Sequence, residues 1–441
     1  MSGPRRIAFV ARNFSGESLL SARAITKLEN VELFGICDQP FATDETTLFR
    51  EVAGVADTHD SDQLIATAKQ LQQKHGPLNR VVTTYETLLE PVAQTVEALG
   101  LEGMSVATVR RALNKSSLIA TLKEAGVGTA RSLVCTDEAQ ARSFTHEVGY
   151  PVVLKPLNGS GGLATWAIRD DSELSLALEL TAPSFARPLL IEECLFGKEL
   201  CIDTITIANE PRVYSICCYT PSILGALQNP AIQWCCVMPR DISDEFYQPL
   251  ITQGLDAVRA LSVGDAMTHM EAFMLADGRV CFTDATLRPA GARIAPMLAY
   301  AYDIDPYFAW ARATLDGCFD GPWTRKYAVG TIFLRGAGSG TVESVTGFEI
   351  VERKLRETLA DVRLPRAGAV KASTYTGDGY ITVRHPETAV VEEALDFIAQ
   401  TVDINYSSSE SSATLRDEWN KRLQYNRLYK PVWEIDSHTR M

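Results

Sequence analysis

The first hundred residues alternate apolar runs with helical segments. Strand-like runs occur at RRIAFVA, VELFGICD and RVVTTYE, and helical patterns cover residues 17–28 and LEPVAQTVEALG, which Gly100 closes. Alternating strands and helices are typical of a parallel sheet covered by helices, so we predict a small α/β domain here. No G-x-G-x-x-G follows the first strand, and a dinucleotide site is therefore not expected in this region.

A mixed region of helices and strands comes next. The sequence from Ser105 to Gly126 is helical, and YPVVLKPLNGSGGLATWAIRD reads as strand, glycine-rich turn and strand. Several more strands follow in PLLIEECLFGKELCIDTITIANEPRVYSICCYTP, and helices are predicted over residues 245–261 and PYFAWARATLDG. A break near Gly321-Pro322 separates this α+β body from a last region.

The last region is rich in strand patterns at first and helical later. Strands are predicted in VGTIFLRGAGSGTVESVTG and YTGDGYITVRH, and a helix is predicted over residues 387–401. A short amphipathic helix with Leu415, Trp419 and Leu423 is expected near the end.

The stretch HMEAFMLADGRVCFTDATLRP, residues 269–289, is predicted to be a β-hairpin that turns at Asp277-Gly278. A two-residue turn there pairs Leu275 with Val280, Phe273 with Phe282, and Glu271 with Asp284, all on one face. Two facing carboxylates would have Cβ atoms about 4.5–5.5 Å apart, and like charges in that position destabilise a sheet. The pair therefore calls for a functional explanation.

Composition places the chain among ordinary globular proteins. Its 441 residues suggest about two to four domains. The formal net charge of −13 argues against sequence-independent binding to nucleic acid or to an anionic membrane. No apolar run approaches the roughly 20 residues of a membrane span, and the start of the chain does not resemble a secretory signal. A cytoplasmic location is expected.

Ten cysteines are present, and their spacing does not suggest a metal site. There is no C-x-x-C, and the adjacent pairs Cys217-Cys218 and Cys235-Cys236 lie in strand-like runs, where neighbours point to opposite faces. Free, mostly buried thiols are expected.

Several segments carry candidate chemistry, each with an ordinary alternative. Lys155 precedes the glycine-rich NGSGG, which could cradle phosphate; the alternative is a flexible hairpin with a lysine in solvent. The run IEECLFGKEL could offer backbone groups to an adenine edge and Glu199 to ribose hydroxyls, or it could be a strand end with solvated acids. Lys115 could be a surface lysine, and Arg288 could merely neutralise Asp284.

The order of these segments decides between the alternatives. Lys115, the lysine-bearing strand and glycine loop, IEECLFGKEL, HMEAF and TDATLRPAG together resemble the ATP-grasp superfamily, and within it the carboxylate–amine ligases, including the L-amino acid ligases. The resemblance covers about residues 1–320, and the region after Gly330 looks like the closing domain of that group and of biotin carboxylase. It implies a multidomain α/β and α+β chain with the ATP-grasp fold. The implied parts are an N-terminal parallel α/β pre-grasp domain (1–104), a small lobe (105–190), a large lobe (191–322) and a C-terminal β-rich closing domain (323–441).

The resemblance also implies roles for individual residues. Those at the ATP phosphates are Lys115, Lys155 and the loop residues Gly159, Ser160, Gly161 and Gly162. The adenine and ribose would be held by Glu192, Glu193, Leu195 and Glu199. The ligands of the magnesium ion would be Glu271, Asp284 and Thr286. Mn²⁺ could take the place of Mg²⁺ at this site. Lys155 and Arg288 would be catalytic, and the substrate-binding residues would be Glu86, His269, Arg288, Gly291 and Arg293.

The sequence departs from the family pattern at the second metal segment. The usual motif is Glu-x-Asn-x-Arg, whereas this chain has Asp284, Thr286 and Arg288 at those places. Aspartate is shorter than glutamate, and threonine offers a neutral hydroxyl in place of an amide oxygen. A second Mg²⁺ would then be held more weakly or differently.

The resemblance implies an ADP-forming ligase that joins a small carboxylate to an amine through an acyl phosphate, with amino acids as the expected substrates. Arg293 would bind the carboxylate of the second amino acid; a plain surface charge is the alternative. A homodimer is compatible with the family. Two other functions stay open, a bicarbonate-dependent carboxylase of the biotin-carboxylase type and a nucleotide-binding protein without turnover.

Overall fold

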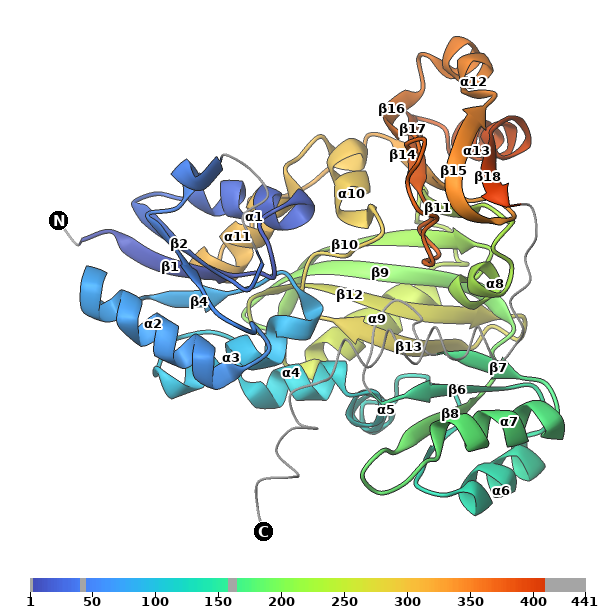
Figure 1. Ribbon diagram of the computed structural model, residues 1–441, viewed down its shortest axis with the longest axis horizontal. Helices are drawn as coiled ribbons and strands as arrows, with labels where there is room; N and C mark the ends of the chain where they lie inside the picture. The colour runs from blue at the N-terminus through green and yellow to red at the C-terminus, as the bar shows by residue number, and fades with distance from the viewer. Residues whose placement is uncertain (1–2, 40–44, 158–164, 409–441) are drawn as a thin grey trace.

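The computed structural model of the chain describes residues 3–39, 45–157 and 165–408. The N-terminal part is a parallel sheet in the order β3-β2-β1-β4, with apolar cores on both faces (Figure 1). The prediction of a small parallel α/β domain is confirmed. Its elements are β1 (Arg5–Val10), α1 (Gly16–Thr26), β2 (Val31–Cys37), η1 (Glu45–Leu48), β3 (Glu51–Gly54), α2 (Ser61–His75), β4 (Arg80–Val82), η2 (Glu86–Leu88) and α3 (Leu89–Ala98).

The helical stretch predicted from Ser105 to Gly126 is two helices, α4 (Val106–Leu113) and α5 (Lys115–Glu124). They separate at Asn114, which adopts an extended backbone and accepts the backbone N–H of Ser117 at 3.1 Å through its side chain. An asparagine in this role ends one helix and starts the next, because it satisfies an otherwise unpaired amide. The break puts Lys115 at the first position of α5.

A small antiparallel sheet in the order β5-β8-β6-β7 carries two helices on its apolar face. It lies at the lower right of Figure 1. The prediction of a strand through PVVLKP is confirmed, although the glycine-rich residues 158–164 lie outside the described residues. The elements are β5 (Ser132–Cys135), α6 (Glu138–Val148), β6 (Val152–Pro156), β7 (Trp166–Ile168), α7 (Asp171–Thr181) and β8 (Leu189–Glu193).

The centre of the molecule is an eight-stranded sheet in the order β13-β12-β9-β10-β11-β14-β17-β16. One face packs on α9 and α5, and the other packs on α10, α11 and the N-terminal domain (Figure 1). The helices predicted over 245–261 and PYFAWARATLDG are confirmed as α9 and α11, whereas α8 and α10 were not predicted. The elements are β9 (Gly197–Ile207), β10 (Glu210–Thr220), α8 (Ile223–Gln228), β11 (Trp234–Met238), α9 (Gln248–Leu261), β12 (Ala266–Leu275), β13 (Val280–Thr286), α10 (Ile294–Tyr302) and α11 (Pro306–Asp316).

The last region adds three strands to the central sheet, so the sheet continues across the Gly321-Pro322 break. The helix predicted over 387–401 is confirmed as α13, which packs on these strands. The domain boundaries remain predictions, and the helix expected near Trp419 lies outside the described residues. The elements are β14 (Ala328–Leu334), β15 (Ser339–Thr346), α12 (Phe348–Leu355), β16 (Leu359–Arg363), β17 (Gly379–His385), α13 (Thr388–Thr401) and β18 (Asp403–Ser408).

All ten cysteines are free, seven of them buried and three partly buried, as the sequence predicts. Cys217 and Cys218 enter different cores on opposite faces of the central sheet, which confirms the alternation expected for the adjacent pairs. None of the helices described here is both long and apolar enough to cross a membrane.

Candidate nucleotide and metal site

A cavity of about 630 Å³ lies between the small sheet and the central sheet. Its lining includes Lys155 of β6, Glu192 of β8, Glu199 of β9 and the facing acids Glu271 and Asp284. Lys115 and one side of α8 complete part of the wall. The cavity therefore gathers the side chains to which the family resemblance assigns nucleotide and metal binding.

Lys155 is buried, so the alternative of a solvent-directed lysine is wrong. Its Nζ lies 2.5 Å from Glu192 Oε2, and the two side chains are 8% and 6% exposed. The two charges compensate each other in a place where neither would be stable alone. The loop residues Gly159, Ser160, Gly161 and Gly162 lie outside the described residues, so their predicted contact with phosphate stays a prediction.

The segment after β8 forms one end of the cavity. The Glu193 carboxylate turns towards Arg131, whose Nε lies 2.9 Å from Oε2 and whose backbone N–H donates to Oε1 at 2.8 Å. Burial opposes ionisation of Glu193, but these hydrogen bonds hold its pKa below the usual value. Leu195 lines the cavity beside it. Any adenine contact of Glu193 would therefore use its backbone, since its side chain is already engaged.

Glu199 stands on β9 with its carboxylate almost fully buried. Oε2 accepts the backbone N–H of Ile223 at 2.6 Å, which joins β9 to the first residue of α8. Burial and the nearby charge of Glu271 raise the pKa of Glu199 to about 8, although the hydrogen bond from Ile223 and the charge of Lys155 oppose this. Glu199 is therefore protonated at neutral pH before any ligand binds.

Glu271 and Asp284 face each other across β12 and β13, as predicted, but by a different route. The turn has three residues, because the Leu275 N–H donates to Arg279 O at 2.9 Å and Gly278 adopts φ +84°. This shifts the register, so Phe273 faces Cys281 and Met274 faces Val280. A bulge between Glu271 and Ala272 restores the pairing of the acids.

The shifted register corrects the predicted face of the hairpin. Val280 and Phe282 point into the core with α9, opposite to the acids, and do not share a face with Glu271. Phe273 lines the cavity together with Glu271 and Asp284. The two errors, the turn length and the missed bulge, cancel from Glu271 to His269, so the acids still face each other.

Each facing acid has a cationic neighbour within the chain. Lys115 Nζ lies 3.0 Å from Asp284 Oδ2, and His269 Nε2 lies 3.6 Å from Glu271 Oε1. Burial tends to lower the pKa of Lys115, but Asp284 raises it above its ordinary value. Lys115 is thus not a surface lysine, and the partner of Asp284 is Lys115, not Arg288.

Thr286 completes the candidate metal ligands. It is 4% exposed, and its hydroxyl has no hydrogen-bond partner among the described residues. Two facing carboxylates with an unfilled hydroxyl nearby are hard oxygen donors, which is the kind of ligand that Mg²⁺ and Mn²⁺ prefer. The residues present therefore fit such an ion, with Glu271 and Asp284 as its charged ligands.

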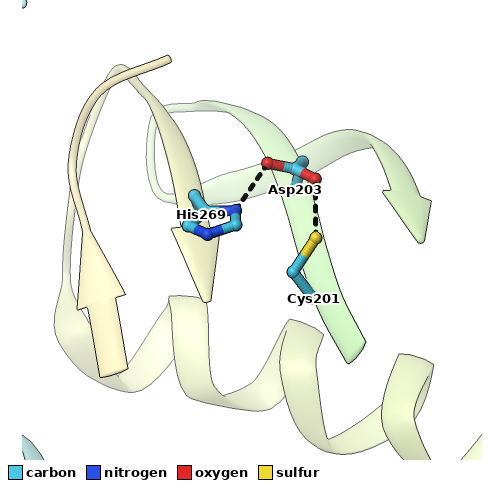
Figure 2. Close-up of side chains that lie close together, drawn as sticks. All are labelled: Cys201, Asp203 and His269. Carbon is cyan, nitrogen blue, oxygen red and sulfur yellow. Dashed lines mark hydrogen bonds and ion pairs between the residues drawn. The ribbon is translucent and has the colours of Figure 1, made fainter. Parts of the chain in front are cut away.

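On β9 and β12, the strands that pair at Glu271, lies a buried group of three side chains, Cys201, Asp203 and His269 (Figure 2). Asp203 lies 2.9 Å from His269 Nδ1 through Oδ1, and its Oδ2 accepts the thiol of Cys201 at 3.4 Å. Burial would lower the pKa of His269, but the Asp203 carboxylate raises it well above the ordinary value. The imidazolium can then donate from both nitrogens, one to Asp203 and one towards Glu271. His269 is held as a neighbour of the metal ligand.

The residues predicted to bind substrate surround the loop after β13. Arg288 Nη2 lies 2.6 Å from Glu86 Oε2, which belongs to η2 of the N-terminal domain. A side chain added at Gly291 would meet only Arg288, at 3.9 Å, so the space over this glycine is open. The structure thus brings Arg288 and Glu86, two of the residues predicted to bind substrate, into direct contact.

Arg293 begins α10 in a left-handed conformation. It forms an ion pair with Asp361 of β16, and its guanidinium carbon lies 4.1 Å from the centre of the Tyr380 ring. The alternative of a plain surface charge is therefore wrong. Both partners of Arg293, Asp361 and Tyr380, belong to the region after residue 323. Through Arg293 this C-terminal region contacts the candidate substrate site.

Sequence reasoning missed Asp203 and Glu17. Asp203 could have been found, because Glu199, Cys201 and Asp203 alternate along one strand and must share its face. Glu17, in the first turn of α1, lies where the charges of Arg288 and Arg293 both act on it. No local pattern marks this position, since the two arginines are more than 250 residues further along the chain.

Part of the chain is similar in sequence to a known domain and to known ligases. The ATP-grasp domain model matches residues 120–292. An L-arginine-specific L-amino acid ligase of Bacillus subtilis is 23% identical over 236 residues, which are 52% of this chain and 56% of the relative. An alanine–anticapsin ligase of the same species is 22% identical over 251 residues, 52% of each chain. The chain thus matches about half the length of these curated relatives.

Other matches reach further along the chain. A formate-dependent phosphoribosylglycinamide formyltransferase of Anaeromyxobacter dehalogenans is 27% identical over 325 residues, 71% of this chain and 77% of the relative. The crystal structure of an L-amino acid ligase from Bacillus licheniformis covers 92% of this chain and 100% of its own, with a TM-score of 0.76 and 19% identity. The domain match and the shared fold lead to one conclusion: residues 120–292 match the ATP-grasp domain, and they lie in a chain with the fold of an L-amino acid ligase structure.

Proposed function

We propose that the protein is an ATP-dependent carboxylate–amine ligase that releases ADP and phosphate and joins amino acids. The observation that carries the proposal is the single cavity that gathers Lys115, Lys155 and the facing pair Glu271 and Asp284. Two cations and a pair of hard acids suit a triphosphate with its divalent ion. The matches to amino acid ligases support the choice of substrate class.

The chain's residues would act by positioning and by charge. Lys155 and Lys115 would exchange their carboxylate partners for phosphate oxygens, while Glu199 would hold ribose hydroxyls as a protonated acid. Glu271 and Asp284 would hold Mg²⁺, which supplies positive charge to the phosphates when bound.

Bond formation would take place beside Arg288. Its guanidinium would stabilise the negative charge that develops as the γ-phosphoryl passes to the substrate carboxylate, and Glu86 keeps it oriented. The amine of the second substrate then attacks the acyl phosphate, and phosphate leaves with the bonding electron pair. No protein nucleophile is required, because both reacting groups belong to substrates.

The test is ADP release against a matrix of amino acids, dipeptides and simple amines, with mass detection of the products. ADP should form only when a carboxylate and an amine are both present, together with an amide product of matching mass. AMP and pyrophosphate as products would contradict the acyl-phosphate reaction.

A carboxylating reaction is the second candidate. It is favoured by the similarity to structures of N5-carboxyaminoimidazole ribonucleotide synthetases, such as that of Thermotoga maritima, with a TM-score of 0.65 and 14% identity over 91% of this chain. ADP release that needs bicarbonate and no amino acid would favour this reaction. Binding of ATP and Mg²⁺ without ADP formation across the whole panel would indicate a nucleotide-binding protein without turnover.

A further inference from the structure

A second group of side chains that can bind a metal ion lies on the central sheet, next to the candidate Mg²⁺ ligands. Cys201 and Asp203 of β9 and His269 of β12 each offer one ligand atom, and the three atoms all lie within 4.8 Å of one another (Figure 2). Asp203 is directly opposite His269 across the two strands, and Cys201 is directly opposite Glu271. Paired strands hold these side chains on one face in fixed positions.

The three groups are withdrawn from water. Cys201 is 0% exposed, Asp203 is 3% exposed, and the side chain of His269 is 12% exposed. A buried carboxylate needs strong partners, but one of the two donors to Asp203 is the thiol of Cys201, at 3.4 Å. A thiol is a weak hydrogen-bond donor, whereas a thiolate is a strong metal ligand.

The spacing of the ligand atoms fits a tetrahedral ion. Bonds of about 2.0–2.3 Å to nitrogen, oxygen and sulfur would place neighbouring ligand atoms about 3.3–3.6 Å apart. Cys201 Sγ lies 3.4 Å from Asp203 Oδ2, and His269 Nδ1 lies 2.9 Å from Asp203 Oδ1. Asp203 also borders a cavity of about 10 Å³. That volume is about the room for one water, which can complete a set of four ligands.

We propose that Cys201, Asp203 and His269 bind one divalent ion of the zinc class, at a site separate from that of Mg²⁺. The ligand types select the ion, because thiolate and imidazole favour Zn²⁺ or Co²⁺, and Mg²⁺ favours oxygen. The charges also balance. Cys201 loses its thiol proton on coordination, so one thiolate and one carboxylate neutralise the two positive charges in a place that water hardly reaches.

The ion would also fix the direction of His269. With Nδ1 bound to the metal, the ring proton is on Nε2, which lies 3.6 Å from Glu271 Oε1. Histidines that bind a metal commonly donate their other N–H to a carboxylate. Glu271, a candidate Mg²⁺ ligand, would thus be oriented through the imidazole by the first ion. This inference goes beyond the proposed function, because it concerns a structural ion that the ligase reaction does not require.

The test measures metal content and affinity in the full-length protein. Wild type and variants are produced in medium with Zn²⁺ and dialysed into buffer with Mg²⁺. Zinc per chain is then measured by mass spectrometry, and zinc affinity by competition with a chelator. The variants are Cys201→Ser, Asp203→Asn and Glu271→Gln. Cys135→Ser is the control, because Cys135 is a buried thiol on β5 that belongs to no group of metal-ligating side chains among the described residues.

Wild type and Cys135→Ser should each hold about one zinc ion per chain. Cys201→Ser and Asp203→Asn should weaken zinc binding at least about 100-fold, since each removes a ligand, whereas residues that only orient a ligand typically contribute about 10- to 100-fold. Glu271→Gln should keep the ion and weaken its binding no more than about 10-fold. Wild type produced with Co²⁺ should show an intense near-ultraviolet charge-transfer band, which a thiolate ligand gives and oxygen ligands do not.

Equal zinc content in wild type and Cys201→Ser would overturn the site and leave a hydrogen-bonded triad. A Co²⁺ spectrum without the thiolate band would do the same, and so would loss of zinc from Cys135→Ser. If Cys201→Ser does not fold, as judged by thermal melts, Asp203→Asn and the Co²⁺ spectrum of the wild type decide the question. None of these measurements involves ADP release, so the result is separate from that of the proposed function.

Discussion

Replacing Glu199 by glutamine should abolish one part of the pH dependence of stability. Glu199 has a pKa of about 8 in the folded protein, against an ordinary value of 4.5. Between these values the folded state holds a proton that the unfolded state has released, so the free energy of unfolding falls as pH rises. The stabilising proton is fully present below pH 4.5 and is lost as pH passes 8.

The magnitude follows from the two pKa values. Each pKa unit corresponds to about 1.4 kcal/mol, and the slope for one proton has the same value per pH unit. From pH 5 to pH 8 the wild type should therefore lose about 3–5 kcal/mol relative to Glu199→Gln. Glutamine cannot ionise, and its carbonyl can still accept the N–H of Ile223, which Glu199 accepts at 2.6 Å.

The assay is urea unfolding in EDTA without nucleotide at several values between pH 5 and pH 8.5. Glu147→Gln serves as the control, since Glu147 is an exposed acid and the substitution is chemically the same. The difference in unfolding free energy between Glu199→Gln and wild type should grow in favour of the variant as pH rises. Parallel profiles for the two proteins would refute the reasoning, because they would show that Glu199 ionises in the fold as it does in solution.

Three other substitutions test the site. Lys155→Met should destabilise the protein by about 3–5 kcal/mol, because it leaves Glu192 buried without its cation, and adding Glu192→Gln should recover most of that loss in urea unfolding. Glu271→Gln should lower Mn²⁺ affinity about 10- to 100-fold by titration while changing metal-free stability by less than about 1 kcal/mol; unchanged Mn²⁺ affinity would remove Glu271 from the metal ligands. Arg288→Lys should lower kcat for ADP release about 10²- to 10³-fold with the KM for ATP unchanged, and a rise in KM alone would assign Arg288 to binding.

The near-neutral stability expected for Glu271→Gln depends on contacts that no sequence pattern displays. With the hairpin alone, two facing acids repel, and neutralising one of them should stabilise the metal-free protein. Lys115 beside Asp284 and His269 beside Glu271 already offset that repulsion. A local sequence pattern shows which residues face each other across a hairpin. It does not show which positively charged side chains of other segments, such as Lys115, lie beside them.

Secondary structure was predictable where the apolar period was long and undisturbed. The β1, α9, α11 and α13 patterns were identified because burial on one face imposes a period on the sequence. The break at Asn114 was missed, and so were several helices, among them α10. Asparagine at 114 competes for the backbone through its own side chain, and α10 begins at Arg293 in a left-handed conformation that local propensity does not favour.

The sequence by itself determined the order of the site residues along the chain and the facing positions of Glu271 and Asp284, because strand alternation and a turn near Gly278 are local properties. Only the tertiary structure decided the partners: Lys115 meets Asp284 across 169 positions, and Arg288 meets Glu86 across 202. It also decided the protonation of Glu199, since this depends on burial by segments distant in sequence. Charge and solvation act through space, and local periodicity carries no information about which distant segments will lie close together.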